Sequence, residues 1–357
     1  MQRRQFLQAC ATATACTVTT TYARSPAERI KMGQIGTKHA HAGGQLSTAR
    51  QLSDLYEVVG VVEPDDQQYA RIAQQPTYRD VPRLTLDQLL GTPGLQVVAV
   101  ETEVRDLLRT ARICLEAGLH IHLDKPAGES YEELVALHRL AEGKKRVIQM
   151  GYMFRYNLGF QFLFEIAREG WLGNIFEVHG VMSKKIGPAE RSQLAEYPGG
   201  SMFELGCHLI DPLFHLLGTP DNVVPFNRGT LSGDPLLDNM LAVFEYPRAT
   251  ATIRSSLQEV DGGRRRQFVV CGDQGTVAIR PLEPPVLELT LEAPRGNFRK
   301  GAQLVNLAPS AGRYHGAWME LARVVRGEIP FPYSHSHDLA VQQAVLAASG
   351  LLAWQTL

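Results

Sequence analysis

A lysine that follows a short apolar segment is the first candidate for chemistry. Residues 118–126 have the sequence Gly-Leu-His-Ile-His-Leu-Asp-Lys-Pro, which predicts a strand ending before Asp124 and a turn fixed by proline. Ligands bind at the carboxyl ends of the strands in parallel sheets. An ammonium group there can hydrogen-bond a substrate hydroxyl and help to move its proton. The segment therefore predicts a catalytic role for Lys125, with a solvated Asp-Lys pair as the alternative.

A carboxylate and an imidazole form the second candidate group. Glu204, His208 and Asp211 are spaced i, i+4 and i+7, which places them on one face of a helix. Such a pair can accept, orient and relay a proton. In the alternative interpretation Glu204 forms a capping box with Ser201 and His208 is a half-buried structural histidine. A metal set built from His208, Asp211 and His215 lacks closing ligands, so we predict no metal site.

The turn after the first predicted strand is typical of a phosphate-binding loop. Residues 33–44 read Gly-Gln-Ile-Gly-Thr-Lys-His-Ala-His-Ala-Gly-Gly. In a dinucleotide-binding fold, such a turn brings backbone N–H groups and a helix N-terminus to a pyrophosphate. Counted from Gly36, Lys38 and His41 occupy the second and third glycine positions of the G-x-G-x-x-G pattern. We hypothesise that the Lys38 ammonium compensates for the less intimate backbone approach.

An acid at the end of the second predicted strand indicates the type of nucleotide. Glu63 follows Val61-Val62 and can accept hydrogen bonds from the ribose hydroxyls of an adenosine. Its charge would repel a 2′-phosphate, so it favours NAD over NADP. A strand-end carboxylate in solvent is the alternative.

The elements that must position these residues follow two patterns. Up to residue 150, short apolar runs alternate with helix-period segments, which predicts a doubly wound parallel sheet. The expected strands there are 30–35, 57–62, 96–100, 120–123 and 147–150. After residue 151, β-rich segments separated by turn signals predict an α+β domain with a large, mainly antiparallel sheet. Helices return at 317–326 and 338–352.

Composition and charge narrow the class of partner. The chain has 357 residues, of which 44% are hydrophobic, and a formal net charge of −1, with acidic and basic residues interspersed. No basic face predicts nucleic-acid binding, and no apolar run is long enough to span a bilayer. A small-molecule partner is the expectation. Beyond residue 25, only Cys114, Cys207 and Cys271 occur, which is neither a disulfide framework nor a zinc pattern.

The first 25 residues resemble a Tat export signal. Arg3-Arg4-Gln5-Phe6-Leu7 precedes an Ala/Thr-rich run to Val18, and Thr21-Tyr22-Ala23 offers a cleavage site. A disordered N-terminus that begins with two arginines is the alternative. The signal predicts a periplasmic or secreted protein, and without it a cytoplasmic one. Because the Tat route carries folded proteins, a retained nucleotide is compatible with export.

Several motifs, in the expected order, make the chain after residue 29 similar to the glucose–fructose oxidoreductase/inositol dehydrogenase (Gfo/Idh/MocA) family. The segments that carry the resemblance are 116–126, ending in Asp124-Lys125-Pro126; 151–157 (Gly-Tyr-Met-Phe-Arg-Tyr-Asn); 170–175 (Gly-Trp-Leu-Gly-Asn-Ile); 198–211, from Pro198 to Asp211; and 272–276. The resemblance implies an NAD-binding Rossmann domain over 28–150 and a substrate and oligomerisation domain over 151–357, whose final helices pack back on the first.

The resemblance also implies site residues. Lys125, His208 and Glu204 would be catalytic. Cofactor contacts would come from Gly33, Gly36, Thr37, Lys38, His39, Glu63, Thr102, Asp124, Lys125 and Pro126. Substrate contacts would come from Arg155, Tyr156, Lys184 and Asp211. The family's sheet further suggests a homodimer or homotetramer.

The chain departs from the family pattern at two kinds of position. Asp124 stands where the family has Glu, and Glu204 stands where the family has Asp. Glu103, Val104 and Leu107 stand where the family has Pro, Asn and His near the nicotinamide end. Together with Lys38, which stands at a glycine position, these departures affect the expected mode of cofactor binding more than they affect the expected fold.

Together these observations predict an NAD(H)-dependent oxidoreductase acting on a secondary hydroxyl of a sugar, glycoside or cyclitol. The alternative is an enzyme that retains NAD and catalyses no net redox change, such as a glycosidase, a hydratase or lyase, or an epimerase working through a transient keto sugar. A non-catalytic sugar- or nucleotide-binding module is less favoured because Lys125 and His208 are present.

Overall fold

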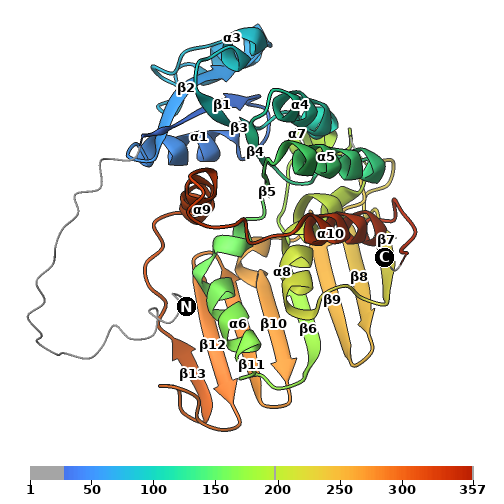
Figure 1. Cartoon of the computed structure of the whole chain (residues 1–357). Helices are drawn as coiled ribbons and strands as arrows, with labels where there is room; N and C mark the ends of the chain where they lie inside the picture. The colour runs from blue at the N-terminus through green and yellow to red at the C-terminus, as the bar shows by residue number, and fades with distance from the viewer. Residues whose placement is uncertain (1–27, 197, 356–357) are drawn as a thin grey trace, which may run out of the picture.

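Two sheets organise the chain (Figure 1). The structure is a computed structural model that describes residues 28–196 and 198–355, so the export signal predicted over 1–25 lies outside the described residues. Within these residues no helix has the length and apolar character needed to cross a membrane. The predicted fold class, a parallel Rossmann-type sheet followed by an α+β domain, is confirmed.

Sheet A contains five strands in the order β2-β1-β3-β4-β5, and every pairing in it is parallel. Its strands are β1 (Ile30–Ile35), β2 (Tyr56–Val62), β3 (Leu95–Val100), β4 (His120–Leu123) and β5 (Ile148–Met150). The connecting helices are α1 (Ala42–Gln51), α2 (Asp66–Ile72), α3 (Leu86–Leu90), α4 (Val104–Glu116) and α5 (Tyr131–Lys144). Because the strands are parallel, their carboxyl ends, including the one before Asp124, meet at one edge.

Sheet B contains eight strands in the order β13-β12-β11-β10-β6-β9-β8-β7, and only the β6–β9 pairing is parallel. Its strands are β6 (Ile175–Val181), β7 (Asn222–Arg228), β8 (Asn239–Tyr246), β9 (Ala249–Ser256), β10 (Gln267–Gly272), β11 (Gly275–Leu282), β12 (Pro285–Leu291) and β13 (Gly301–Val305). The sequence did not predict β7 and β13. They are edge strands whose residues are almost all exposed or half-buried, so they lack the buried apolar alternation that marks the central strands.

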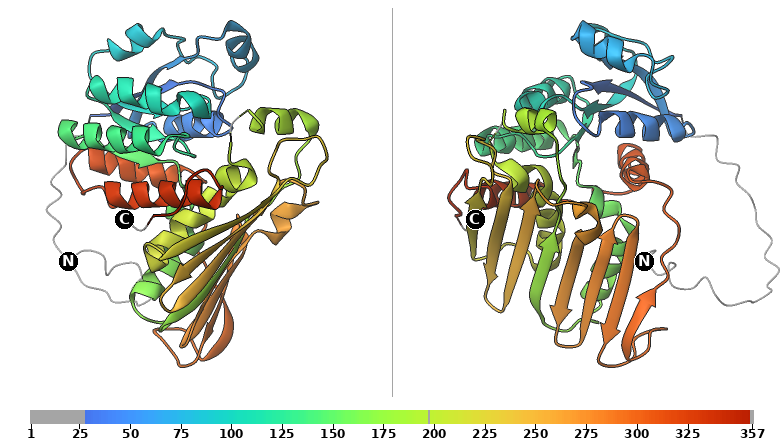
Figure 2. Two further views of the ribbon diagram at one scale, coloured as in Figure 1. Left: turned by 90° about the vertical axis from the view of Figure 1, so that its right-hand side faces the viewer. Right: turned by 180° about the vertical axis from the view of Figure 1, so that it is seen from behind.

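Helices cover one face of sheet B. α6 (Leu158–Arg168) packs on β11 and β12, and α8 (Cys207–Leu217) packs on β6 and β9 (Figure 2). Along β12, buried residues alternate with exposed or half-buried ones, as expected for a sheet with one open face. The predicted homo-oligomer stays a prediction.

The last two helices return to the first domain. α9 (His315–Val325) lies against sheet A, where Tyr56 Oη donates to the Trp318 carbonyl (2.8 Å) and Trp318 Nε1 donates to Gln45 Oε1 (2.9 Å). Trp318 is fully buried in a cluster with Ile30 and Met32. α10 (His335–Ala348) packs on α5 and α8. These contacts join the end of the chain to both domains (Figure 1).

A buried ion-pair cluster holds α10 in place. Arg155, in the short helix η1 (Met153–Tyr156), donates from Nη2 to Asp211 Oδ1 and to Asp338 Oδ1, both at 2.6 Å. The Tyr333 ring lies 3.8 Å from the guanidinium carbon. His337 Nε2 lies 3.1 Å from Asp211 Oδ1. Because Arg155 is only 1% exposed, the two carboxylates are the compensation that its burial requires.

Replacing Arg155 with Met should destabilise the protein strongly. The variant leaves Asp211 and Asp338 buried without a cation, which typically costs about 3–5 kcal/mol. Urea unfolding followed by circular dichroism measures the free energy of unfolding. Lys300→Met, which removes an exposed ion pair with Glu292, is the control and should change it by less than about 0.5 kcal/mol. Equal losses in the two variants would contradict this account of the cluster.

Candidate active site

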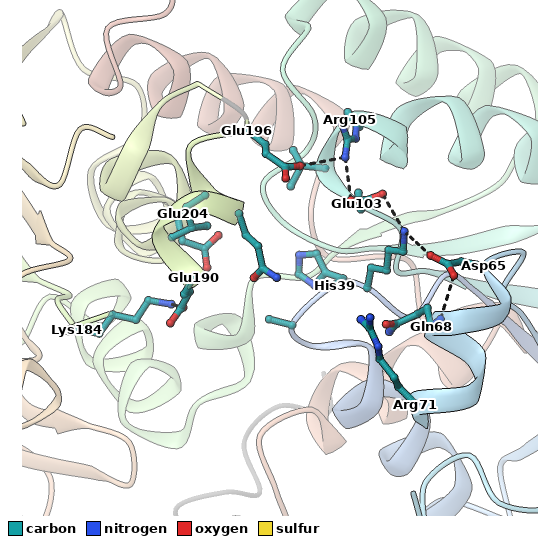
Figure 3. Close-up of a pocket in the computed structure, with 15 residues that line it drawn as sticks. His39, Asp65, Gln68, Arg71, Glu103, Arg105, Lys184, Glu190, Glu196 and Glu204 are labelled. Atoms are coloured by element: carbon teal, nitrogen blue, oxygen red, sulfur yellow. Dashed lines mark hydrogen bonds and ion pairs between the residues drawn. The ribbon is translucent and has the colours of Figure 1, made fainter. Parts of the chain in front are cut away.

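A cavity of about 410 Å³ lies between the two domains (Figure 3). The first domain contributes side chains from the loop after β1, from α2 and from the start of α4. The second contributes Lys184, Glu204 and the helix α7 (Pro188–Leu194) with its following turn. The polar and charged side chains in the lining are Lys38, His39, Asp65, Gln68, Arg71, Glu103, Arg105, Lys184, Glu190, Gln193, Glu196 and Glu204. A cavity lined in this way suits a ligand rich in hydroxyl or charged groups.

Lys125 and Glu204 meet behind this cavity. The Lys125 ammonium donates to the Glu204 carbonyl oxygen at 2.9 Å and lies 3.4 Å from Glu204 Oε1. Burial by itself would lower the pKa of Lys125, but the Glu204 carboxylate outweighs it and the pKa is raised. Burial likewise opposes ionisation of Glu204, yet Lys125 and Lys184 lower its pKa. Both groups are therefore charged in this site, with Lys125 only 1% exposed and Glu204 reaching the cavity.

His208 is buried beside this pair. It is 2% exposed, and its Nδ1 has no hydrogen-bond partner among the described residues. Burial, with a further contribution from the Lys125 charge, holds the pKa of His208 well below its ordinary value. The ring is therefore neutral and can accept a proton. The structure thus brings Lys125, Glu204 and His208 together, as the sequence predicted, although the catalytic roles stay predictions.

The helical face predicted for Glu204, His208 and Asp211 is interrupted. Residues Met202–Gly206 form a π-helical turn, η2, and α8 begins only at Cys207. The π turn changes the register, so Glu204 contacts Lys125 while Asp211 pairs with Arg155. The capping-box alternative is wrong, because Ser201 makes no side-chain cap and its hydroxyl donates to the Ser255 carbonyl (3.1 Å).

A second cavity, of about 790 Å³, lies at the carboxyl ends of β1, β2 and β3. Gly36, Glu63 and Thr102 line it, as does Lys38. Gly36 has φ +86°, and a Cβ there would lie 2.6 Å from the Thr102 backbone nitrogen. Only glycine therefore allows this close approach of two backbone segments. The cavity has the position and the glycine turn that an adenosine and its phosphates require.

Glu63 and Lys38 already have partners inside the protein. Glu63 Oε2 accepts from the Thr37 hydroxyl at 2.6 Å, and Oε1 accepts from the Asp65 backbone N–H at 3.0 Å. A carboxylate offers about four lone-pair sites, so these bonds leave capacity for a ribose hydroxyl. Lys38 Nζ lies 3.2 Å from Asp65 and 3.6 Å from Glu103. Its charge is thus partly compensated before any phosphate arrives.

The remaining predicted cofactor residues lie in different environments. Gly33 is inside β1, where a Cβ would meet the Leu89 side chain at 2.4 Å, so its visible role is packing. Asp124 is fully buried and accepts from the Lys125 backbone N–H at 2.6 Å. The peptide bond before Pro126 is cis. Of the residues departing from the family pattern, Glu103 lines both cavities, Val104 is largely buried and lines the first, and Leu107 is fully buried.

The four predicted substrate residues divide into two groups. Lys184 lines the first cavity, where its ammonium donates to Glu190 Oε1 at 2.6 Å. Arg155 and Asp211 belong to the buried cluster that holds α10. Tyr156 Oη donates to Glu320 Oε1 of α9 at 2.7 Å. The visible role of these three is to connect the C-terminal helices, and their contact with a substrate stays a prediction.

A cluster around Asp124 was not singled out from the sequence. His41 Nδ1 lies 3.0 Å from Asp124 Oδ1, and His39 Nδ1 lies 3.3 Å from Asp124 Oδ2. Glu101, directly after β3, is fully buried beside them. The His41 ring is 6.0 Å from the His208 ring, which places the cluster next to Lys125 and His208. The only signal in the sequence was the replacement of a glycine position by His41.

Comparison with family models gives two adjoining matches. Residues 30–152 match the model described as an oxidoreductase family with an NAD-binding Rossmann fold. Residues 160–278 match the GFO/IDH/MocA C-terminal domain. The first match covers sheet A, and the second covers sheet B from β6 to the first residues of β11.

Individual relatives are more distant. The oxidoreductase YdgJ of Escherichia coli is 24% identical over 201 residues, covering 55% of this chain and 57% of YdgJ. The scyllo-inositol 2-dehydrogenase (NADP(+)) IolW of Bacillus subtilis is 27% identical over 141 residues, covering 39% of each chain. The chain thus spans about half the length, or less, of these curated relatives. The structure of UDP-N-acetylglucosamine 3-dehydrogenase GnnA from Acidithiobacillus ferrooxidans superimposes with a TM-score of 0.74 at 17% identity, covering 91% of this chain and 98% of GnnA, and supports the fold.

Gly36→Ala should weaken nucleotide binding more than the equally strained substitution Gly118→Ala. A methyl group at Gly36 meets the Thr102 backbone, whereas Gly118 has a similar φ of +82° with nothing within 4 Å of the added Cβ. Both variants bear a strain of about 1–2 kcal/mol, but only Gly36→Ala deforms the turn at the cavity. We expect NAD affinity, measured by calorimetric titration, to fall more than about tenfold in Gly36→Ala, which is about 1.4 kcal/mol, and to stay unchanged in Gly118→Ala. Similar affinities in both variants would remove the turn from the binding site.

Proposed function

Because this chain belongs to the Gfo/Idh/MocA oxidoreductase family, we propose that it transfers hydride between a nicotinamide dinucleotide and a secondary hydroxyl carbon of a sugar, glycoside or cyclitol. The observation that carries the proposal is the buried Lys125 ammonium, held by Glu204 and flanked by the neutral His208 ring at the inner end of the cavity. When bound, the dinucleotide supplies the hydride acceptor or donor. The chain must hold the hydroxyl and move its proton.

Each residue of this group has a separate task. Lys125 donates a hydrogen bond to the reacting hydroxyl oxygen, which replaces its present bond to the Glu204 carbonyl. The neutral imidazole of His208 accepts the hydroxyl proton. Glu204 keeps the ammonium charged and oriented. In the reverse direction the same groups return the proton to the developing alkoxide.

The residues at the second cavity fit a dinucleotide. The glycine turn at Gly36 permits backbone approach, and Lys38 provides a cation that lines both cavities. Glu63 at the end of β2 favours an adenosine ribose without a 2′-phosphate, because two anions would meet there. We therefore propose NAD(H) as the cofactor, although IolW is named for NADP(+).

The lining of the first cavity supports a polyhydroxylated substrate. The second domain lines this cavity with Lys184, Glu190 and Glu196, which are labelled in Figure 3, and with Gln193, so both hydrogen-bond donors and acceptors are present. Such groups can hydrogen-bond successive hydroxyls of a sugar or cyclitol ring. The names of IolW and GnnA, a cyclitol and an amino-sugar nucleotide dehydrogenase, are consistent with this substrate class.

A second candidate function is cofactor recycling without net redox change. The observation that favours it is the twin-arginine segment at residues 3–4, from which we propose export of the folded chain to the periplasm or beyond. Outside the cytoplasm a retained nucleotide has no obvious free pool to exchange with. Mass spectrometry of the nucleotide released on denaturing protein purified from its native compartment tests this candidate. A stoichiometric nucleotide with turnover but no NADH accumulation would favour recycling, whereas steady NADH formation would favour a dehydrogenase.

Lys125→Met and His208→Asn should each lower kcat/KM by about 100-fold or more, the usual contribution of a positioned proton-transfer group. Activity is measured with the best substrate from a panel of cyclitols, hexoses and UDP-N-acetylglucosamine. Lys144→Met, which alters an exposed lysine on α5, is the control and should keep full activity. NAD affinity should change little in the two site variants. Normal turnover in either would remove that residue from the mechanism.

Glu63→Ser should shift the preference for the nucleotide toward NADP. Removing the carboxylate relieves repulsion of a 2′-phosphate and deletes an acceptor for the ribose hydroxyls. We expect the ratio of NADP to NAD affinity to rise by about tenfold or more, equivalent to about 1.4 kcal/mol. Glu57→Ala, near the opposite end of β2, is the control. An unchanged ratio would show that Glu63 does not read the ribose.

A further inference from the structure

Two buried carboxylates face one another at the edge of sheet A without a cation. Glu101 and Asp124 follow β3 and β4, and both are 0% exposed. Among the described residues no lysine or arginine forms an ion pair with either, because the Lys125 ammonium is directed to Glu204. Both oxygens of Glu101 also lack a hydrogen-bond partner within the described part of the chain. Two buried carboxyl groups in contact require either a proton shared between them or a compensating cation.

Three imidazoles surround these carboxylates. His39 and His41 come from the loop after β1, and His122 comes from β4. The ligand atoms of His39, His41 and Asp124 lie within 4.8 Å of one another, and so do those of Glu101, His122 and Asp124. Asp124 is common to both sets and therefore lies at the centre of the cluster.

The hydrogen bonds of His39 fix its tautomer and turn its Nδ1 toward the carboxylates. His39 Nε2 lies 2.9 Å from the Lys125 carbonyl oxygen, which can only accept, so Nε2 carries the proton and donates. Nδ1 then carries the lone pair, which accepts from the His41 backbone N–H at a long 3.3 Å and lies 3.3 Å from Asp124 Oδ2 and 3.6 Å from Glu101 Oε2. A metal-bound histidine typically donates its other N–H to a backbone carbonyl in this manner.

His122 shows the same arrangement from the opposite side. Its Nδ1 lies 3.0 Å from Gln149 Oε1, and the Gln149 amide nitrogen donates to Tyr156 Oη and to the Ala317 carbonyl. Those two bonds fix the amide so that its oxygen faces His122, and Nδ1 must donate. His122 Nε2 is then a buried lone pair without a hydrogen-bond partner among the described residues.

The separations match the edges of a coordination polyhedron. For metal–ligand bonds of about 2.0–2.1 Å, tetrahedral geometry places neighbouring ligand atoms about 3.3 Å apart. The observed separations are 3.0 Å from His41 Nδ1 to Asp124 Oδ1, 3.3 Å from His39 Nδ1 to Asp124 Oδ2 and 3.6 Å from His39 Nδ1 to Glu101 Oε2, so Asp124 faces the two imidazoles with different oxygens. Imidazole and carboxylate ligands together suit a divalent first-row metal such as Zn²⁺.

We propose that His39, His41 and Asp124, with Glu101 as the fourth ligand, bind one divalent transition-metal ion at the base of the interdomain cavity. The ion neutralises the two carboxylates and fastens the loop after β1 to the end of β4. His41 stands at the third glycine position of this loop. Coordination by the ion therefore holds the loop in place of the close packing that a glycine permits. The site adjoins Lys125, but the inference is independent of the proposed redox activity.

Metal binding can be measured directly on the untagged full-length chain. The protein is dialysed against a chelator, checked for metal content by mass spectrometry, and titrated with ZnCl₂ in a calorimeter. A parallel titration with CoCl₂ follows the visible absorption of the bound ion, which reports nitrogen and oxygen ligands without an activity assay. We expect one equivalent per chain and a rise in Tm on binding, because an ion that binds only the folded state stabilises it.

His41→Ala and Asp124→Asn should weaken Zn²⁺ binding by more than about 100-fold, since even outer partners of metal ligands contribute about 10- to 100-fold. His179→Ala, which alters a histidine of sheet B far from the cluster in sequence and bonded to Thr252, is the matched control and should bind normally. If a ligand variant fails to fold, the stoichiometry of the wild-type chain still decides the question. The wild type must bind one ion for the proposal to stand.

The variant Glu101→Gln distinguishes a bound metal ion from a proton shared between Glu101 and Asp124. If Glu101 instead shares a proton with Asp124, the neutral isostere keeps that hydrogen bond, Tm is unchanged, and the wild type binds no Zn²⁺ after chelation. That result would overturn the proposal. So would binding that survives His41→Ala but is lost in His122→Asn, because the ion would then occupy the inner residues. Weakened Zn²⁺ binding in Glu101→Gln would support Glu101 as the fourth ligand.

Discussion

The burial of the Lys125 ammonium is the constraint on which the site depends. A cation that is 1% exposed is stable only if another group compensates it, and Glu204 does so with both its carboxylate and its carbonyl oxygen. Lys125 follows a strand of sheet A, whereas Glu204 belongs to a π-helical turn packed on sheet B. The contact therefore couples the two domains at the point where their cavity ends.

The C-terminal helices make this coupling rigid. α9 buries Trp318 against sheet A, and α10 is fixed by the Arg155–Asp211–Asp338 cluster. These contacts explain why Arg155, Tyr156 and Asp211, polar residues in motif-like segments, are directed into the protein instead of toward the cavity. In a sequence, a charged residue that forms a buried ion pair cannot be told from one that binds a ligand, because both roles require the same residue types.

The loop after β1 combines two unusual features. Lys38 forms ion pairs with Asp65 and Glu103. Its positive charge therefore lies at the nucleotide cavity and is partly compensated there. His39 and His41 turn in the opposite direction, toward Asp124. The two replaced glycine positions thus have separate consequences. Lys38 concerns phosphate binding, and His41 belongs to the polar cluster around Asp124 next to Lys125.

The sequence by itself determined the parallel sheet, the mainly antiparallel sheet and the family, because apolar periodicity and ordered motifs are local properties. It also indicated Lys125, Glu204 and His208, since each follows or lies within a recognisable element. Edge strands β7 and β13 and the π turn at Met202–Gly206 were decided by pairing and packing with distant segments. The approach of His39, His41, Glu101 and Asp124 was likewise decided by the tertiary structure, because β1, β3 and β4, which are separated along the chain, end at one edge of the parallel sheet.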